Sequence, residues 1–283
     1  FLIKFPTPSA NALSPVNIPC GSLPEIDAVE DVTFSESEEI FKDEAFPPGP
    51  ASIGDAKSAE WLRAVDLNGA GSDCLFDDDI VPTDVKQGAI GNCWLIAAMA
   101  GLAEFPDRVM DLFPDGSDLA EDGKYTVRLF NPMKQDFDDI EIDDHVPVKS
   151  VKDHTPLFAK PNKSGEIWVM LVEKAVAKMV GNYSSLIGGQ TYWGYEVFTG
   201  CTDVMWLKKT DKKTHEFTGY ILNPKAQQAD AKNNGKMRSC PMYKTKDSPV
   251  LKGDDLWEQI VEWDEAKHLM GASISGGIEA SYG

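Results

Sequence analysis

The run of residues 87–98 constrains most strongly how this chain of 283 residues can fold. Gly88 and Gly91 punctuate its first part and an apolar segment follows directly, so the pattern predicts a tight loop that turns into a buried helix. Cys93 stands where the loop meets the helix. The sequence therefore predicts a thiol at the first turn of a core helix.

A thiol at that position has two interpretations. The unpaired N–H groups and the dipole of a helix N-terminus favour the thiolate, which is the nucleophilic form. The side-chain amide of Gln87, returned over the sulfur by the loop, and the backbone N–H of Cys93 would then form the two halves of an oxyanion hole. Alternatively, Cys93 is a small buried hydrophobe among apolar neighbours such as Ile90 and Trp94, as many free cysteines are.

The grouping Gln-Gly-x-x-Gly-x-Cys-Trp at residues 87–94 resembles the active-site motif of papain-like cysteine proteases and, more closely, that of calpains. Further segments, in the same order along the chain, are similar to segments of calpain catalytic cores. They are residues 40–48 and 50–54, the approach at 82–88, the Asp-Asp-x-x-Pro turn within 140–149, the helical segment 166–178, and residues 181–183 and 188–200. The resemblance is dense over residues 40–205 and thins toward the C-terminus.

This resemblance implies an α+β fold of the papain-like type, with a helical first half that carries the nucleophile helix and the start of a β-rich second half. We expect four segments along the chain. They are a disordered or loosely attached leader at 1–38, the first half of the core at 39–207, a polar inserted loop at 208–252, and the incomplete beginning of the second half at 253–283.

Local patterns predict the main elements. We expect helices over residues 55–65, 93–104 and 164–179, the last with Ser164 as its N-cap, and strands over 125–130 and 138–148. Toward the C-terminus we expect a strand over 217–222, an amphipathic helix from Asp254 or Asp255 to Leu269, and a strand over 270–275.

The activity implied by the resemblance is limited proteolysis of protein substrates, with Cys93 as the nucleophile and Gln87 as the oxyanion donor. In calpains the catalytic histidine lies in a Gly-His-Ala-Tyr stretch and the catalytic asparagine in an Asn-Pro-Trp stretch. The printed sequence ends before either, and none of its four histidines has such a context. Because a cysteine protease needs an imidazole to activate the thiol and protonate the leaving amine, we expect the printed polypeptide alone to be inactive.

The resemblance also implies regulatory calcium. Asp84 and Glu166 match acidic calcium ligands of calpain cores, and backbone carbonyls near Asp77 and Asp79 would complete an oxygen shell. The alternative is that Asp84 caps a turn and that Glu166 favours a helix N-terminus. Residues 66–77 imitate an EF-hand loop, but Ala70 stands at its fifth position and an aspartate replaces the final glutamate.

Composition indicates the compartment and excludes some partners. The five cysteines are odd in number and widely spaced, which favours reduced thiols in an intracellular, cytoplasmic protein. No segment approaches the ~20 consecutive apolar residues of a membrane span, and no signal peptide is evident. A net charge of −19 argues against nucleic acid and anionic membranes as main partners and keeps a protein soluble.

A second hypothesis comes from a different class. It is a non-catalytic, calpain-like module that binds calcium or protein partners and lacks the catalytic histidine. Asn92 stands where calpains usually carry an aspartate. This difference does not decide between the protease and the non-catalytic module. A purely redox-sensing role for Cys93 would need a resolving cysteine, and the sequence indicates none. For either hypothesis, flanking regulatory domains outside the printed sequence are possible partners of this core.

Overall fold

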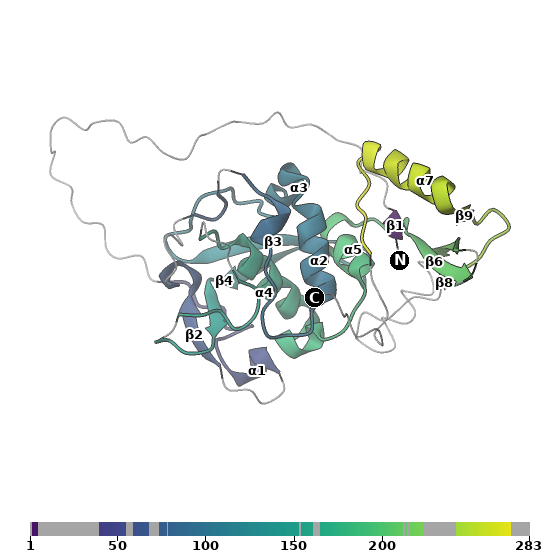
Figure 1. The fold of residues 1–283 in the computed structure, drawn as a ribbon. Helices are drawn as coiled ribbons and strands as arrows, with labels where there is room; N and C mark the ends of the chain where they lie inside the picture. The colour runs from purple at the N-terminus through teal and green to yellow at the C-terminus, as the bar shows by residue number, and fades with distance from the viewer. Residues whose placement is uncertain are drawn as a thin grey trace, which may run out of the picture.

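The computed structural model describes residues 2–4, 40–54, 59–67, 74–77, 79–152, 154–160, 165–211, 213, 215–222 and 242–272. Its fold is mixed α+β, as the sequence predicts, with three helices packed together and several small antiparallel sheets (Figure 1). In the described part of the chain, no helix is both long enough and apolar enough to cross a membrane.

The first part of the fold holds helices α1 to α5 and two two-stranded sheets. Its elements are α1 (Pro50–Ile53), β2 (Glu60–Arg63), η1 (Ala64–Asp66), η2 (Pro82–Asp84), α2 (Cys93–Leu102), α3 (Pro106–Met110), β3 (Lys124–Asn131), β4 (Asp136–Asp143), β5 (His145–Val148), α4 (Trp168–Val180), η3 (Tyr183–Leu186) and α5 (Thr191–Thr199). Strands β3 and β4 form one antiparallel pair, and β2 and β5 form another.

The second part is a small sheet with one helix beside it (Figure 1). Its elements are β1 (Leu2–Lys4), β6 (Met205–Asp211), β7 (Glu216–Leu222), β8 (Met242–Tyr243), β9 (Val250–Lys252) and α7 (Gly253–Glu265). Strand β6 lies between β1 and β7, while β8 and β9 both pair with β7, and every pairing is antiparallel.

Helices α2, α4 and α5 form the core. Helix α4 is buried along almost its whole length, and α2 buries Leu95, Met99 and Leu102 completely or nearly so. Glycines let α2 and α5 approach closely, because a Cβ on Gly101 would lie 2.0 Å from the Tyr195 hydroxyl and one on Gly194 would lie 2.4 Å from the Ala98 Cβ. The helix that carries Cys93 is therefore fixed to the core along its length.

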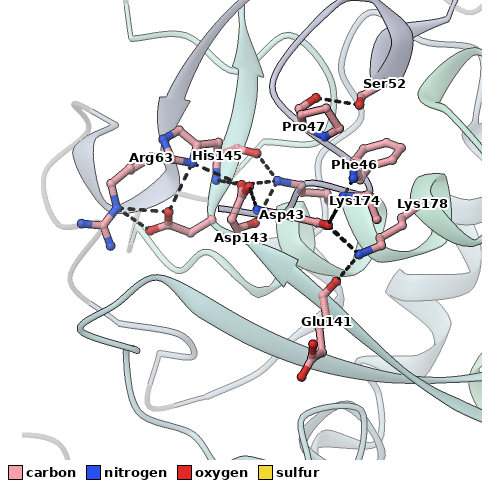
Figure 2. Close-up of polar contacts among 12 residues, drawn as sticks. Asp43, Phe46, Pro47, Ser52, Arg63, Glu141, Asp143, His145, Lys174 and Lys178 are labelled. Atoms are coloured by element: carbon pink, nitrogen blue, oxygen red, sulfur yellow. Dashed lines mark hydrogen bonds and ion pairs between the residues drawn. The ribbon is translucent and has the colours of Figure 1, made fainter. Parts of the chain in front are cut away.

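Charged side chains also join helix α4 to strand β4 and to the segment near residue 43 (Figure 2). The Asp143 cluster consists of Asp43, Asp143, Lys174 and Lys178. The buried Lys174 Nζ donates to Asp143 Oδ1 at 2.6 Å, and Lys178 Nζ donates to Asp43 Oδ2 at 2.7 Å. Burial opposes the ionisation of Asp143, but the hydrogen bond from His145 and the charge of Lys174 together hold its pKa well below the ordinary value. The cluster ties the segment near residue 43 and strand β4 to helix α4.

Most predicted elements are confirmed. The structure has helices α2, α4 and α7 and strands β3 and β7 close to their predicted ranges. Ser164, residues 273–275 of the predicted last strand, and residues 68–73 of the EF-hand-like loop lie outside the described residues. Residues 270–272, the described start of that predicted strand, form no strand. The division of the chain at residues 39, 208 and 253 stays a prediction.

Two further local predictions are wrong. In the described part of the expected helix, residues 59–65, the chain forms strand β2 at Glu60–Arg63, because this segment pairs its backbone with β5, from Glu60 opposite Val148 to Arg63 opposite His145. The expected single strand over 138–148 is two strands. The chain turns at Asp144, whose carboxylate binds Arg63 Nε at 3.0 Å and whose carbonyl accepts the N–H of Ala64.

Candidate active site and cation site

Cys93 is the first residue of α2, and its side chain is exposed although the helix behind it is buried. Asn92 caps the helix through its carbonyl, which accepts the N–H groups of Leu95 and Ile96. The first N–H groups of a helix have no acceptor within the helix. The structure therefore places the thiol at a free, electropositive helix end, as a nucleophile requires.

The loop before Cys93 is held by a neighbouring segment of backbone. Ala89 N–H donates to Leu157 O at 2.9 Å, and Lys160 N–H donates to Lys86 O at 3.0 Å. Between these bonds a Cβ on Gly88 would stand 1.7 Å from Phe158 O, so only glycine fits there. The predicted tight loop is confirmed, and the contact with residues 157–160 fixes its path.

Gln87 lies in this loop with an exposed side chain. Its Nε2 donates to the carbonyl of Ile90 at 2.9 Å, so the amide folds back across the loop toward the helix start. An amide nitrogen carries two hydrogens, and one bond inside the loop leaves the second as a donor for a substrate oxygen. The role of Gln87 as an oxyanion donor stays a prediction.

A glycine turn borders the cysteine loop on another side. Gly188 N–H donates to Gly91 O at 2.9 Å, and a Cβ on Gly189 would meet the Trp94 ring at 2.6 Å. Trp94 Nε1 also donates to Leu186 O at 2.8 Å. Ile187, at the tip of this turn, is 60% exposed. The loop before Cys93 is thus bonded through its backbone to two segments, residues 157–160 and the turn at Gly188.

A buried acid that the sequence motif does not reveal contacts this loop. Glu173 on α4 is fully buried, and its Oε1 accepts Nδ2 of Asn92 at 2.6 Å. Its Oε2 accepts the N–H of Ala159 at 2.9 Å. Burial outweighs these two bonds and raises the pKa of Glu173 to about 7. Because Glu173 and Asn92 are 81 residues apart, no local sequence signal announces their contact.

The structure brings together the two acids predicted to bind calcium. Asp84 and Glu166 are both buried, and Asp84 Oδ2 accepts the N–H of Val81 at 2.7 Å. Glu166 Oε2 accepts Trp168 Nε1 at 2.9 Å, whereas its Oε1 is buried without a hydrogen-bond partner among the described residues. Burial and the neighbouring charge of Asp84 raise the pKa of Glu166 to about 8.

These two carboxylates fit a hard cation, because an unsatisfied buried oxygen next to a second acid is relieved by positive charge. The side chains of Asp77 and Asp79 are exposed. Within the described residues, no group of three or more His, Cys, Asp or Glu side chains is arranged to hold a metal. The contribution of backbone carbonyls near residues 77 and 79 to an oxygen shell stays a prediction.

The four histidines form hydrogen bonds with residues other than Cys93. His145 Nδ1 lies 3.2 Å from Asp143 Oδ1, His154 Nδ1 lies 3.0 Å from Asp66 O, and His215 Nδ1 lies 2.9 Å from Lys209 Nζ. His268 follows α7, where its N–H donates to Trp263 O. Among the described residues, no recorded hydrogen bond or ion pair joins an imidazole to the thiol.

Comparison with known proteins decides the family. A family model described as calpain family cysteine protease matches residues 41–281. The chain belongs to the calpain family. The loop, the thiol and the paired acids described above therefore lie within a calpain protease domain, and the papain-like type of fold predicted from the sequence is confirmed.

Three relatives show the extent of the similarity. The chain is 35% identical over 175 residues to the calpain-type cysteine protease DEK1 of Arabidopsis thaliana, which covers 57% of this chain and 8% of that protein. It is 33% identical over 175 residues to the human calpain-1 catalytic subunit, covering 58% and 24% respectively. It is 32% identical over 181 residues to mouse calpain-12, covering 60% and 24%. The chain thus spans a quarter or less of the length of these curated relatives.

Proposed function

We propose that this chain carries the nucleophile of a calcium-regulated, intracellular cysteine endopeptidase that cleaves protein substrates at a limited number of sites. The observation that carries the proposal is the exposed Cys93 at the start of a helix that is otherwise mostly buried. A cysteine that served only to fill the core would be covered, as Leu95 beside it is. Membership of a family of cysteine proteases supports the same role.

The chain's own residues supply the first step of the reaction. The Cys93 thiolate forms a bond to the carbonyl carbon of the scissile peptide, and the carbonyl oxygen takes the negative charge. The second N–H of the Gln87 amide and the backbone N–H of Cys93 would donate to that oxygen. The leaving amine takes its proton from a general acid, which in calpains is a histidine of the second half of the core. Activity is therefore proposed for the full-length protein.

Calcium is the cofactor we propose for the buried acid pair. Asp84 and Glu166 would hold the ion together with backbone carbonyls near residues 77 and 79. The ion would supply positive charge that offsets two carboxylates, and it would take no part in breaking the peptide bond. Because η2, which carries Asp84, lies just before the loop of residues 86–91, binding there would brace the approach to Cys93.

We also carry forward the proposed division of the chain. Residues 39–207 form the first half of the core and 253–283 begin the second, with 208–252 as an inserted segment. An intracellular location fits the five cysteines, which follow no disulfide pattern. The second hypothesis, a non-catalytic binding module, is favoured by one observation: no described imidazole has a recorded contact with Cys93.

The deciding experiment uses the full-length protein that contains this sequence. Hydrolysis of a fluorescent casein is measured with calcium and with a chelator, for the wild type and for Cys93→Ala. We expect calcium-stimulated cleavage by the wild type and a loss of about three orders of magnitude or more in the variant, because nucleophile and base act as a unit. Cys201→Ala is the matched control and should retain full activity.

Two results would reverse the conclusion. A folded wild-type protein that binds calcium but does not cleave casein would make the binding module the leading function. Cleavage that survives Cys93→Ala would show that another group is the nucleophile.

A further inference from the structure

The carboxylate of Glu173 lies at a junction between two segments that shape the Cys93 loop. One of its oxygens accepts the side-chain amide of Asn92, the residue directly before the thiol, at 2.6 Å. The other accepts the backbone N–H of Ala159 at 2.9 Å. Both Asn92 and Glu173 are buried, with 0% and 2% of their surfaces exposed. A single side chain on α4 thus joins the start of α2 to residues 157–160.

The segment of residues 157–160 supports the loop before Cys93. Residues 157–160 hold Lys86 and Ala89 by backbone hydrogen bonds and leave no room for a side chain at Gly88. Glu173 therefore binds the loop at its end, through Asn92, and binds its support through Ala159. The position of Cys93 relative to Gln87 depends on both connections.

We propose that Glu173 is a positioning residue for the nucleophile, acting through Asn92 and Ala159 to hold Cys93 at the first turn of α2. The inference rests on the proposed function of Cys93. Glu173 itself does not touch the sulfur or a substrate in this scheme.

The buried amide of Asn92 gives this pair a testable asymmetry. Its Oδ1 is buried without a hydrogen-bond partner in the described part of the chain, while its Nδ2 donates to Glu173. A glutamine at position 173 offers both a donor and an acceptor. With the Asn92 amide rotated by half a turn, that glutamine would donate to Oδ1 and still accept the N–H of Ala159. Glu173→Gln is therefore expected to keep both connections, whereas Glu173→Leu removes them at similar volume.

The experiment measures alkylation of Cys93 by iodoacetamide in the intact chain, with the site resolved by mass spectrometry. All variants are measured at one pH, well below the unfolding temperature of the least stable. We expect Glu173→Gln to react within about twofold of the wild type. We expect Glu173→Leu to react roughly five- to tenfold more slowly, because the thiol loses its place at the helix end. Glu196→Leu, a buried acid on α5, is the matched control and should leave the rate unchanged.

The direction of the change separates positioning from a simple charge effect. Removing a nearby negative charge by itself favours the thiolate, so a charge effect predicts that Glu173→Leu reacts faster. A purely structural role predicts a lower unfolding temperature with an unchanged Cys93 rate. Either result would overturn the proposal.

A reciprocal exchange covers the case in which Glu173→Leu fails to fold. Asn92→Asp places a carboxylate, the residue that calpains usually carry here, against Glu173. One of the two acids must then hold a proton, and we expect alkylation at pH 8, where both tend to ionise, to be slower than in the wild type. Adding Glu173→Gln restores an amide next to a carboxylate and should recover the rate to within about threefold of the wild type. A double variant that recovers neither folding nor rate would count against the inference.

The same measurement distinguishes a failure of the inference from a failure of the proposed function. In the wild type, Cys93 should react much faster than Cys201, because burial raises the pKa of the Cys201 thiol. If the two react equally, Cys93 is not a prepared nucleophile and the proposed function loses its support. If Cys93 is fast but every variant matches the wild type, the function stands and only the role of Glu173 is refuted.

Discussion

At Gly88 a single hydrogen atom in place of a side chain sets the path of the loop before the thiol. The nearest atom to a Cβ there would be Phe158 O at 1.7 Å, which no side-chain rotation can relieve because it belongs to the backbone. At Gly91 a Cβ would meet only Ile187 Cγ2, at an ordinary 3.6 Å. The two glycines of this motif therefore differ greatly in whether a side chain could replace the hydrogen atom.

We predict that Gly88→Ala lowers the free energy of unfolding by roughly 2–4 kcal/mol, because loop and support must separate to admit the methyl group. Gly91→Ala is the control and should change it by less than about 0.5 kcal/mol. Urea unfolding followed by tryptophan fluorescence measures both. Equal effects at the two positions would show that the loop does not depend on the contact with Phe158.

The protonation of Glu173 makes stability depend on pH. Its pKa is raised from 4.5 to about 7 by burial, so the folded state disfavours the charged form. Its stabilising contribution is complete below pH 4.5 and is lost as the pH rises through 7. Between pH 5 and pH 8 the wild type should lose roughly 2–3 kcal/mol of unfolding free energy relative to Glu173→Gln. Urea unfolding of both proteins at the two pH values tests this, and parallel curves would contradict it.

Among the elements, helix α4 carries a buried lysine, Lys174, that bonds it to the neighbouring strands. Lys174 is fully buried and donates to Asp143 Oδ1 and to the carbonyls of Asp143 and His145 at 2.6–2.9 Å. These contacts hold the end of β4 and the start of β5 against the helix (Figure 2). An apolar residue of similar length would leave the Asp143 carboxylate without its buried partner.

We predict that Lys174→Met lowers the free energy of unfolding by about 3–5 kcal/mol, because breaking one side of a buried pair leaves an uncompensated charge. Arg128→Met removes an ion pair with Asp139 in which both side chains are 47% exposed, and it should have little effect. Thermal unfolding of the two variants measures the contrast. A Lys174→Met protein as stable as the wild type would show that the Asp143 cluster adds nothing to stability.

Elements with a strong local pattern could be predicted from the sequence, and those that depend on distant partners could not. The apolar run after Cys93 specifies α2 by itself, and alternation specifies β3. Strand β2 was missed because its pairing partner β5 lies more than 80 residues away. For the same reason the motif revealed Cys93 and Gln87, while the contact of Glu173 with Asn92 became visible only in the folded chain.

At the scale of the whole molecule, the buried acid pair links the stability of the protein to calcium. The net charge of −19 is spread over the chain, but Asp84 and Glu166 are buried together. We predict that calcium at 100 times its dissociation constant raises the free energy of unfolding by about 2.7 kcal/mol. Asp84→Asn should abolish this gain, whereas Asp139→Asn, which changes an exposed acid, should keep it.

Differential scanning calorimetry with calcium, with magnesium and with a chelator measures that gain. Calcium stabilisation that persists in Asp84→Asn would place the site elsewhere in the chain. No calcium effect in the wild type would favour the alternative in which Asp84 only stabilises the turn of η2, through its bond to the N–H of Val81.

The close packing of α2 has a consequence for anyone who attaches a reporter to this protein. The helix is held closely against α5, since Gly101 fits under Tyr195 and Gly194 fits against Ala98, while Cys93 at its start faces solvent. A fluorophore on Cys93 would therefore turn with the body of the protein and not with a loop. Its polarisation would read out rotational diffusion of the entire particle, so a partner that docks anywhere on the surface would be detected from this one position.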